Sequence, residues 1–424
     1  MNILIKNAFA VLPEGNVRNC SVCIKDGIIV SIGRVPEDFA SDKVIDAADK
    51  LLVPGFVNAH THVYMTVLRN RADDLDFTAW LFDNIIPMEN KLTDNDAYWS
   101  MQLGFMEMLE SGITSFLDMH MFPDVAVKAT LDAGMRGVLS RGLQGGKDSM
   151  EAGRKRFEQA KADISKYKGI STIGFMLAPH APYTCDEYYL KEAAELAGEL
   201  GVGIHTHLSE SMDEQNTIKQ RYDMTPAEFY DRCGILRENT VCAHCVYLSE
   251  SDMALLAERG TSVAHNAASN MKLGNGFADL PAMLKHGINV SLGTDSAASN
   301  NNLSILREIQ LAGLIHKGTH CSATTVSAPE VFDMATLNGA KALGIADAVG
   351  EIKVGKCADL SLFDLNSPGF FPIGDPKAAL CYSSAGLKAD TVLVNGQILL
   401  EKGEFKTIDA ERVRYEINAM TGRL

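Results

Sequence analysis

The sequence predicts an α/β fold, a (β/α)8 TIM-like barrel with a small β-sandwich domain built from both chain ends. Three observations predict it. Eight short runs rich in β-branched residues alternate with helical stretches, each run ends in a polar or histidine-bearing segment, and both chain ends show alternating strands without long helices. Strands that alternate with helices pair in parallel through right-handed crossovers, and eight such units close a barrel.

The eight runs share the position of their polar residues, which stand where each run closes. The closing segments are, in chain order, Asn58–His62, Asp118–Met119, Arg141–Gly142, Pro179–His180, His205–His207, Ala243–His244, His265–Asn266 and Thr294–Asp295. Seven of the eleven histidines fall in these segments. Because the chemistry of a barrel lies at the carboxyl ends of its strands, the pattern predicts one shared site at the barrel mouth.

Turn signals separate the chain ends from this repeating middle part. They are Pro13–Asn16, Asp26–Gly27 and the hairpin signal Asn395–Gly396. A chain of 424 residues also exceeds what one compact core usually holds. We therefore expect a composite β-sandwich domain from residues 1–54 and 347–424, and a catalytic barrel from residues 55–346.

Composition excludes several classes of protein. The 39 basic and 54 acidic residues give a net charge of −15, whereas a nucleic-acid surface needs clustered Lys and Arg. No apolar run approaches the roughly 18 residues of a membrane span, and the first residues alternate like a strand instead of forming a signal peptide. We expect a cytoplasmic homo-oligomer with a small-molecule substrate and no nucleic-acid or membrane partner. The nine scattered cysteines are expected to be small core residues.

The first closing segment holds the clearest chemical signal. His60 and His62 are two residues apart at a strand end, so alternation puts both side chains on one face. Paired imidazoles repel when protonated and are stable together mainly as neutral metal ligands. A single histidine is more often a core residue, but His207 and Asp295 stand at later strand ends. Three imidazoles and one carboxylate suit Zn²⁺, with Fe²⁺ and Mn²⁺ left open, and leave a position for water.

Four motifs together resemble the amidohydrolase superfamily. They are PGFVNAHTH at Pro54–His62, HLSE at His207–Glu210, AHC at Ala243–Cys245 and GTDSAASNNN at Gly293–Asn302. Within that superfamily the chain is similar, over nearly its whole length, to the 5′-methylthioadenosine/S-adenosylhomocysteine deaminases. The resemblance implies the metal-dependent hydrolase type of barrel. Its metal ligands fall on His60, His62, His207 and Asp295.

The resemblance also implies catalytic roles for Glu210, His244 and Asp295. Asp295 would accept a proton from the water that the metal activates, and Glu210 would protonate the purine N1 while the water attacks C6. His244 would orient that water. An alternative for Glu210 is the opening acid of a helix near residues 209–213, which the helix dipole favours.

Substrate contacts follow from the same resemblance. The purine contact falls on His180, with Glu210 and Asp295, and Glu89 falls where an acid binds the ribose hydroxyls. Arg141 and Arg154 fall where arginines face the homocysteine tail, although Arg154 could equally belong to a solvated helix face. The chain departs from the family pattern near the mouth at Asn70, His120 and Ser296. The preferred 5′-substituent is therefore left open.

One metal ion is expected because two-metal barrels carry a bridging Lys or an acid at the end of the fourth strand. The fourth run here, residues 170–176, is followed by Leu-Ala-Pro-His with neither. The predicted function is hydrolytic deamination of a 5′-modified adenosine, namely S-adenosylhomocysteine, 5′-methylthioadenosine, 5′-deoxyadenosine or adenosine. Two alternatives stay open: a mononuclear hydrolase of another heterocycle, such as guanine, a pterin or a triazine, and a barrel that has lost catalysis and serves as a scaffold.

Overall fold

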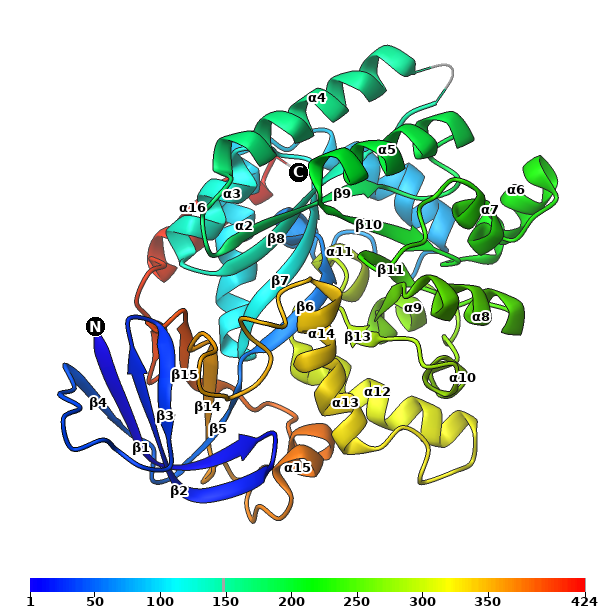
Figure 1. The fold of residues 1–424 in the computed structure, drawn as a ribbon. Coiled ribbons are helices and arrows are strands. Elements are labelled where there is room, and N and C mark those ends of the chain that lie inside the picture. The colour runs from blue at the N-terminus through cyan, green and yellow to red at the C-terminus, as the bar shows by residue number, and fades with distance from the viewer. Residues whose placement is uncertain (147–148, 424) are drawn as a thin grey trace.

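The structure is a computed structural model that describes residues 1–146 and 149–423. Eight parallel strands form one sheet in chain order, and the sheet wraps into a barrel (Figure 1). These strands are β6 (Phe56–Thr61), β7 (Ile113–His120), β8 (Arg136–Leu143), β9 (Ile173–Pro179), β10 (Gly203–Leu208), β11 (Thr240–His244), β12 (Ser262–His265) and β13 (Val290–Leu292). Each strand coincides with a run that the sequence indicated, so the predicted barrel is confirmed.

The first and last strands meet at the mouth of the barrel. The backbone N–H of Asp295 donates to the carbonyl of His60 at 3.0 Å, and Thr61 forms a parallel bridge with Asp295. Two of the predicted metal ligands therefore lie where the barrel closes. Small and branched side chains fill the interior below them, among them Val57, Leu117 and Val241.

Helices cover the outside of the barrel. Parallel sheets are buried on both faces because the crossover helices pack against them. They are α2 (Asp94–Glu110), α3 (Val125–Ala133), α4 (Met150–Tyr167), α5 (Glu187–Leu200), α6 (Met212–Tyr222), α7 (Pro226–Arg232), α8 (Glu250–Arg259), α9 (Ala267–Lys272), α10 (Leu280–Lys285), α11 (Ala297–Asn300), α12 (Ile305–Thr319), α13 (Ala328–Met334) and α14 (Leu337–Ala342). Within the described residues, none of the helices combines the length and apolar character needed to cross a membrane.

A long excursion after β6 contributes to the site. It contains the 3-10 helix η1 (Val63–Leu68), the π-helix η2 (Ala79–Ile85) and the short helix α1 (Ile86–Glu89). α2 follows, begun by a capping box between Thr93 and Asp96 and ended before Gly112, whose φ is 84°.

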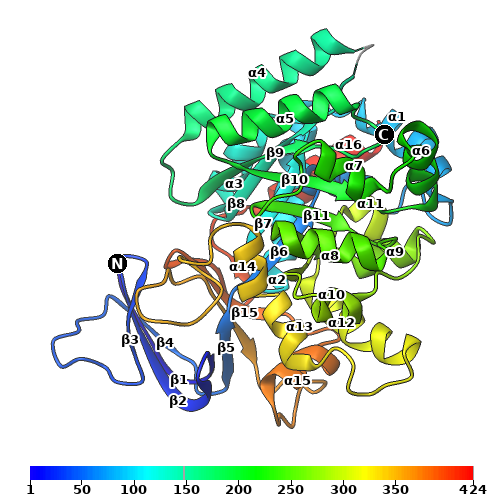
Figure 2. The same cartoon turned by 45° about the vertical axis from the view of Figure 1, so that its right-hand side comes forward.

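The two chain ends form a second sheet, which lies to one side of the barrel (Figure 1 and Figure 2). Its strands are β1 (Asn2–Leu12), β2 (Gly15–Lys25), β3 (Ile28–Ile32), β4 (Lys43–Asp46), β5 (Lys50–Pro54), β14 (Leu360–Asp364), β15 (Ala389–Val394), β16 (Gln397–Glu401) and β17 (Glu404–Phe405). The predicted union of both ends is confirmed. The nine strands are connected by backbone hydrogen bonds, and β5 joins the two chain ends because it pairs with β1 on one side and β14 on the other.

Residues from both ends share the core of this sheet, for example Ile5, Val22, Leu52 and Leu360. Two helices accompany the C-terminal strands: α15 (Pro376–Tyr382) and α16 (Ala410–Thr421). The last helix leaves the sheet and contacts α2 of the barrel. All nine cysteines are free thiols, seven of them buried, in agreement with their expected role as core residues.

A buried ion pair joins the barrel to the second sheet. Arg136, at the start of β8, donates from Nε to Asp359 Oδ2 at 2.8 Å and from Nη2 to Oδ1 at 3.0 Å. The backbone N–H of Asn395 donates to the same carboxylate at 2.7 Å. Both side chains are buried, so removal of one partner leaves a buried charge without its counter-charge.

Replacement of Arg136 by alanine is expected to lower the free energy of unfolding by about 3–5 kcal/mol, measured by urea denaturation followed by circular dichroism. The matched control is Arg232→Ala, which removes an ion pair with Glu187 whose side chains are 34% and 35% exposed. That change is expected to cost less than about 1 kcal/mol. Equal losses in the two variants would contradict a special contribution from the buried pair.

Candidate metal centre and catalytic cavity

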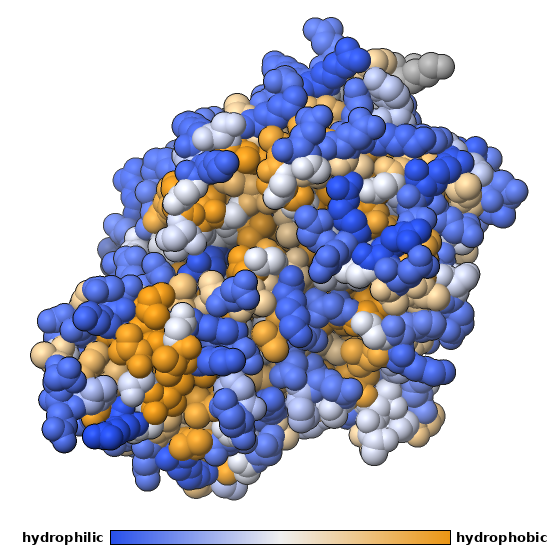
Figure 3. Space-filling view, in the orientation of Figure 1, coloured by the Kyte–Doolittle hydropathy of each residue, from blue (hydrophilic) through white to orange (hydrophobic). Residues whose placement is uncertain are grey.

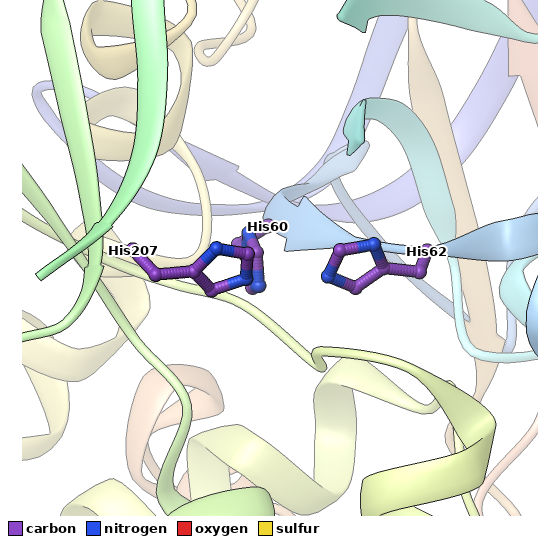
Figure 4. Close-up of side chains that lie close together, drawn as sticks. All are labelled: His60, His62 and His207. Carbon is purple, nitrogen blue, oxygen red and sulfur yellow. The ribbon is translucent and has the colours of Figure 1, made fainter. Parts of the chain in front are cut away.

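Four side chains from three strands converge at the barrel mouth. His60 and His62 come from the end of β6, His207 from β10, and Asp295 follows β13. Figure 4 shows the three imidazoles turned toward one another, and one ring nitrogen of each lies within 4.8 Å of those of the other two. Asp295 Oδ1 lies 3.3 Å from His60 Nε2 and 3.5 Å from His62 Nε2.

Backbone carbonyls fix two of these imidazoles. His62 Nδ1 donates to the carbonyl of Met119 at 2.9 Å, and His207 Nδ1 donates to the carbonyl of His180 at 2.7 Å. A neutral imidazole carries one N–H, so Nε2 of both rings keeps its lone pair. His60 Nε2 is buried and makes no hydrogen bond to any described residue.

The electrostatics of the cluster favour a cation. Burial lowers the pKa of His60 to about 4 and also lowers the pKa of His62, so both rings are neutral near pH 7. Burial opposes ionisation of Asp295, but the surrounding imidazoles outweigh it and hold the pKa of this carboxylate well below its usual range. Neutral imidazoles around one carboxylate, with an unsatisfied nitrogen among them, fit a divalent metal ion.

Asp295 is held from behind by two hydroxyl groups. Ser269 Oγ donates to Asp295 Oδ2 at 2.6 Å, and Ser299 Oγ donates to the same oxygen at 2.7 Å. Asp295 itself has a φ of 56°, in the left-handed region. These contacts leave Oδ1 as the carboxylate oxygen that faces the imidazoles, without a hydroxyl donor of its own among the described residues.

Glu210 and His244 border the cluster, and ligand atoms of His244, His60 and Asp295 lie within 4.8 Å of one another. His244 Nε2 lies 3.8 Å from Glu210 Oε1, and His244 Nδ1 donates to Asn270 Oδ1 at 2.7 Å. Asn275 Nδ2 donates to Glu210 Oε1 at 3.3 Å. Burial raises the pKa of Glu210 to about 7, which suits a group that exchanges a proton near neutral pH.

The helix-start alternative for Glu210 does not match its position. α6 begins at Met212, and its N-cap is Ser211. The acid that binds backbone N–H groups here is Glu214, whose carboxylate accepts from Ser209 N at 2.7 Å and from Glu210 N at 3.1 Å. Glu210 therefore precedes the helix and faces the cavity.

One cavity of about 170 Å³ gathers most of the predicted site residues. His62, Glu89, His180, His207, Glu210, His244, Asp295 and Ser296 line it, together with Tyr64, Met65, Phe77, Trp80, Leu81, Phe82, Ile86, Met119, Met121, Gln144, Tyr183 and Thr184. A larger open hollow of about 470 Å³ lies near the C-terminal end of α2. Its lining includes none of the predicted site residues, so we assign the site to the smaller cavity.

Glu89 and His180 occupy different parts of the cavity wall. Tyr64 OH donates to Glu89 Oε1 at 2.5 Å, and burial raises the pKa of this carboxyl. His180 Nδ1 lies 3.1 Å from Thr184 Oγ1, and burial lowers its pKa to about 3, so the ring is neutral. The cavity wall thus contains an acid and, in contact with the ring of His207, a neutral imidazole.

The two arginines predicted for a substrate tail do not line the cavity. Arg141 lies behind Met121, with Nη1 3.4 Å from the Met121 sulfur, and its Nη2 donates to Gln159 at 3.2 Å. Arg154 is exposed on α4, a helix that is hydrophilic on the face seen in Figure 3. Arg156 reaches the wall instead, because it donates to the carbonyl of Gln144.

Of the three departures from the family pattern, one borders the cavity. Ser296 lines it and caps α11 through Ser299 N. His120 is buried and does not line the cavity, and Asn70 accepts a hydrogen bond from Asn301 at 2.9 Å away from it. Sequence reasoning missed the aromatic side chains of residues 77–82, because an irregular excursion carries no periodic signal.

The chain belongs to the amidohydrolase family, whose family model matches residues 51–399. Its fold and its histidine-rich strand ends place it among the barrel enzymes of that family.

Several relatives within this family are deaminases of adenosine derivatives. The chain is 42% identical over 431 residues to a 5-methylthioadenosine/S-adenosylhomocysteine deaminase of Acetivibrio thermocellus, with 100% of both chains covered. It is 41% identical over 407 residues to a 5′-deoxyadenosine deaminase of Methanothermobacter thermautotrophicus, with 95% of this chain and 94% of that one covered. An adenosine deaminase from Xanthomonas campestris, solved with bound zinc, aligns with a TM-score of 0.94 and 30% identity over 99% of this chain and 98% of that chain.

Proposed function

We propose that this protein is a metal-dependent aminohydrolase that converts a 5′-modified adenosine to the corresponding inosine analogue and releases ammonia. The observation that carries the proposal is one cavity lined by His62, His207, Asp295, Glu210 and Glu89, in which His60, His62 and His207 lie close enough to share a metal ion. The names of the relatives support S-adenosylhomocysteine, 5′-methylthioadenosine, 5′-deoxyadenosine and adenosine as the substrates to compare.

His60, His62, His207 and Asp295 would hold the metal ion, which when bound activates water as a Lewis acid. Asp295 Oδ1 accepts a proton from the attacking water, since Oδ2 is occupied by two serine hydroxyls. Glu210 donates a proton to N1 of the purine, and His244 Nε2 orients the water from the side of Glu210. Water adds at C6, the proton that Asp295 accepted passes to the amino group, and this group leaves as ammonia. C6 becomes a carbonyl carbon as its hydroxyl proton passes to the carboxylate of Glu210.

His180 and Glu89 position the substrate in this proposal. His180 contacts the purine beside the metal ligands, and Glu89 accepts hydrogen bonds from the ribose hydroxyls. Arg141 reads a carboxylate tail only after Met121 moves aside, because the Met121 sulfur stands next to the guanidinium. Arg154 would have to approach the tail from the solvent side of α4.

A substrate panel tests the proposed function. Ammonia release is measured with the four nucleosides, with adenine and guanine as free bases, and with a pterin, and chloride release is measured with a chlorinated triazine. We expect turnover of the nucleosides and none of the free bases. Turnover of guanine, the pterin or the triazine alone would favour another heterocycle hydrolase, and inactivity of the metal-loaded protein on all of them would favour a scaffold.

We propose one divalent ion per chain, Zn²⁺ before Fe²⁺ or Mn²⁺. Both candidate metal groups among the described residues share His60, which supports a single centre. Elemental analysis of purified, active protein is expected to give about one equivalent of metal per chain. Two equivalents, or active protein without metal, would contradict the proposal.

Substitution of Glu89 by alanine is expected to lower kcat/KM by about 10–150-fold for every nucleoside, because a hydrogen bond to a charged group contributes about 1.5–3 kcal/mol. The four nucleosides all carry the ribose, so the loss should be similar among them. Tyr64→Phe is the control, since it removes the partner of Glu89 while keeping the carboxylate. A loss confined to one nucleoside would assign Glu89 to the 5′-substituent.

The remaining expectations are proposals of the same kind. We propose that residues 1–54 and 347–424 form one domain, that residues 55–346 form the other, and that the protein is a cytoplasmic homo-oligomer without nucleic-acid or membrane partners. Light scattering of the purified protein measures its oligomeric state.

A further inference from the structure

His205 is a buried histidine that the proposed chemistry does not use. It lies on β10, two residues before His207, and has no exposed surface. Its Nε2 lies 2.7 Å from His60 Nδ1, and its Nδ1 lies 2.8 Å from Ser140 Oγ on β8. Ser140 Oγ in turn donates to the carbonyl of Asp118 on β7 at 2.7 Å. A chain of hydrogen bonds thus crosses the barrel interior and ends at His60.

The position of each proton in this series of hydrogen bonds follows from the carbonyl of Asp118. The Asp118 carbonyl can only accept, so the single hydroxyl hydrogen of Ser140 points to it. Ser140 Oγ therefore accepts from His205 Nδ1–H. The neutral His205 ring has no second N–H, so its Nε2 accepts from His60 Nδ1–H. His60 Nε2 is left with a free lone pair, and this nitrogen is the buried one without a hydrogen bond.

The opposite direction of hydrogen bonding would prevent His60 from binding a metal ion through Nε2. If His205 donated from Nε2, His60 Nδ1 would accept and the proton of His60 would sit on Nε2, facing Asp295 and the other imidazoles. A protonated Nε2 cannot bind a metal ion. His62 and His207 have backbone carbonyls as their Nδ1 partners, whereas the partner of His60 is a side chain. His60 is therefore the ligand whose orientation depends on replaceable residues.

We propose that Ser140 and His205 are positioning residues that hold His60 in the tautomer that binds metal through Nε2. The inference rests on the proposed metal-dependent function. It predicts that substitution of either residue weakens metal binding, and lowers turnover only through that loss of metal. Partners of a ligating histidine typically change metal affinity by about 10–100-fold when they are removed.

The test measures Zn²⁺ affinity by competition with a chromophoric chelator, on full-length protein freed of metal. His205→Phe keeps a ring but offers no acceptor, and we expect about 10–100-fold weaker binding. His205→Gln is expected to recover most of the affinity, because the amide oxygen can accept from His60 and the amide nitrogen can donate to Ser140. Ser140→Ala frees the tautomer of His205 and is expected to weaken binding less than His205→Phe.

The matched control is His265→Phe, which replaces another buried histidine, on β12, whose ring nitrogens make no hydrogen bond to described residues. It is expected to leave Zn²⁺ affinity unchanged. The absorption spectrum of the Co²⁺-loaded protein gives a second readout, which should change in His205→Phe and remain unaltered in His265→Phe.

The outcomes separate this inference from the proposed function. Wild-type protein that binds one ion and deaminates, together with His205→Phe and Ser140→Ala variants of unchanged affinity and spectrum, would overturn the inference alone. Wild-type protein that binds no ion would overturn the metal-dependent function itself. If His205→Phe does not fold, Ser140→Ala decides the matter, and wild-type affinity in that variant counts against the inference.

Discussion

Replacement of Glu210 by glutamine is expected to lower kcat by about 10²–10⁴-fold, the usual contribution of a general acid or base. The amide keeps the shape of the side chain but cannot deliver a proton to the purine. Glu210 is not among the proposed ligands, so elemental analysis should find the same metal content as in the wild type. Steady-state kinetics with 5′-methylthioadenosine measures the loss.

The pH dependence follows from the same residue. Burial raises the pKa of Glu210 to about 7, so the carboxyl is protonated below that value and ionised above it. Because the protonated form is the proposed donor, kcat of the wild type should fall as the pH rises through about 7. The glutamine variant should lack this decline. Asp213→Asn is the control, since Asp213 is an exposed acid in the first turn of α6. A similar loss in that variant would assign the effect to the start of the helix.

Replacement of Asp295 by asparagine is expected to affect both metal binding and turnover. The change removes the negative charge beside His60 and His62 and the carboxylate proposed to accept the proton of the water. We expect weaker Zn²⁺ binding, and kcat lower by about 10³–10⁴-fold even at saturating Zn²⁺. Chelator competition measures the first effect and kinetics with added Zn²⁺ measures the second.

Ser299→Ala provides the comparison for Asp295. It removes one of two hydroxyls that donate to Asp295 Oδ2 and leaves the carboxylate in place. Loss of one such bond to a charged group should cost about 1.5–3 kcal/mol, far less than loss of the carboxylate itself. Full activity of Asp295→Asn after addition of Zn²⁺ would show that another group accepts the proton.

Most of the barrel could be predicted because each strand ends in a polar segment. His60, His207, His244 and Asp295 mark these ends, and parallel strands necessarily bring them to one edge. The order of strand pairing at the chain ends could not be predicted, because it depends on β5 pairing with both β1 and β14. Strand pairing over such separations leaves no local pattern.

The arginine predictions show a second limit. Each residue of a helix turns the side chain by about 100°, so the side chains of Arg154 and Arg156 point about 160° apart. The sequence of α4 gives both residues the same charge and does not say that Arg156, and not Arg154, contacts the backbone of Gln144. His205 shows a third limit. Its place at a strand end was evident, but its partner Ser140 lies on a strand two positions away in the barrel.

The closure of the barrel has a consequence for stability. The first and last strands meet where Asp295 N donates to the carbonyl of His60, and the side chains of these same two residues are proposed ligands. A bound ion would thus serve as a crosslink between the two edges of the barrel sheet. Binding to the folded state alone stabilises it by about 4 kcal/mol when the free ligand exceeds its Kd about 1,000-fold. This is comparable to the stabilisation that a disulfide gives a secreted domain, about 2–4 kcal/mol, and here it would depend on metal supply instead of oxidation.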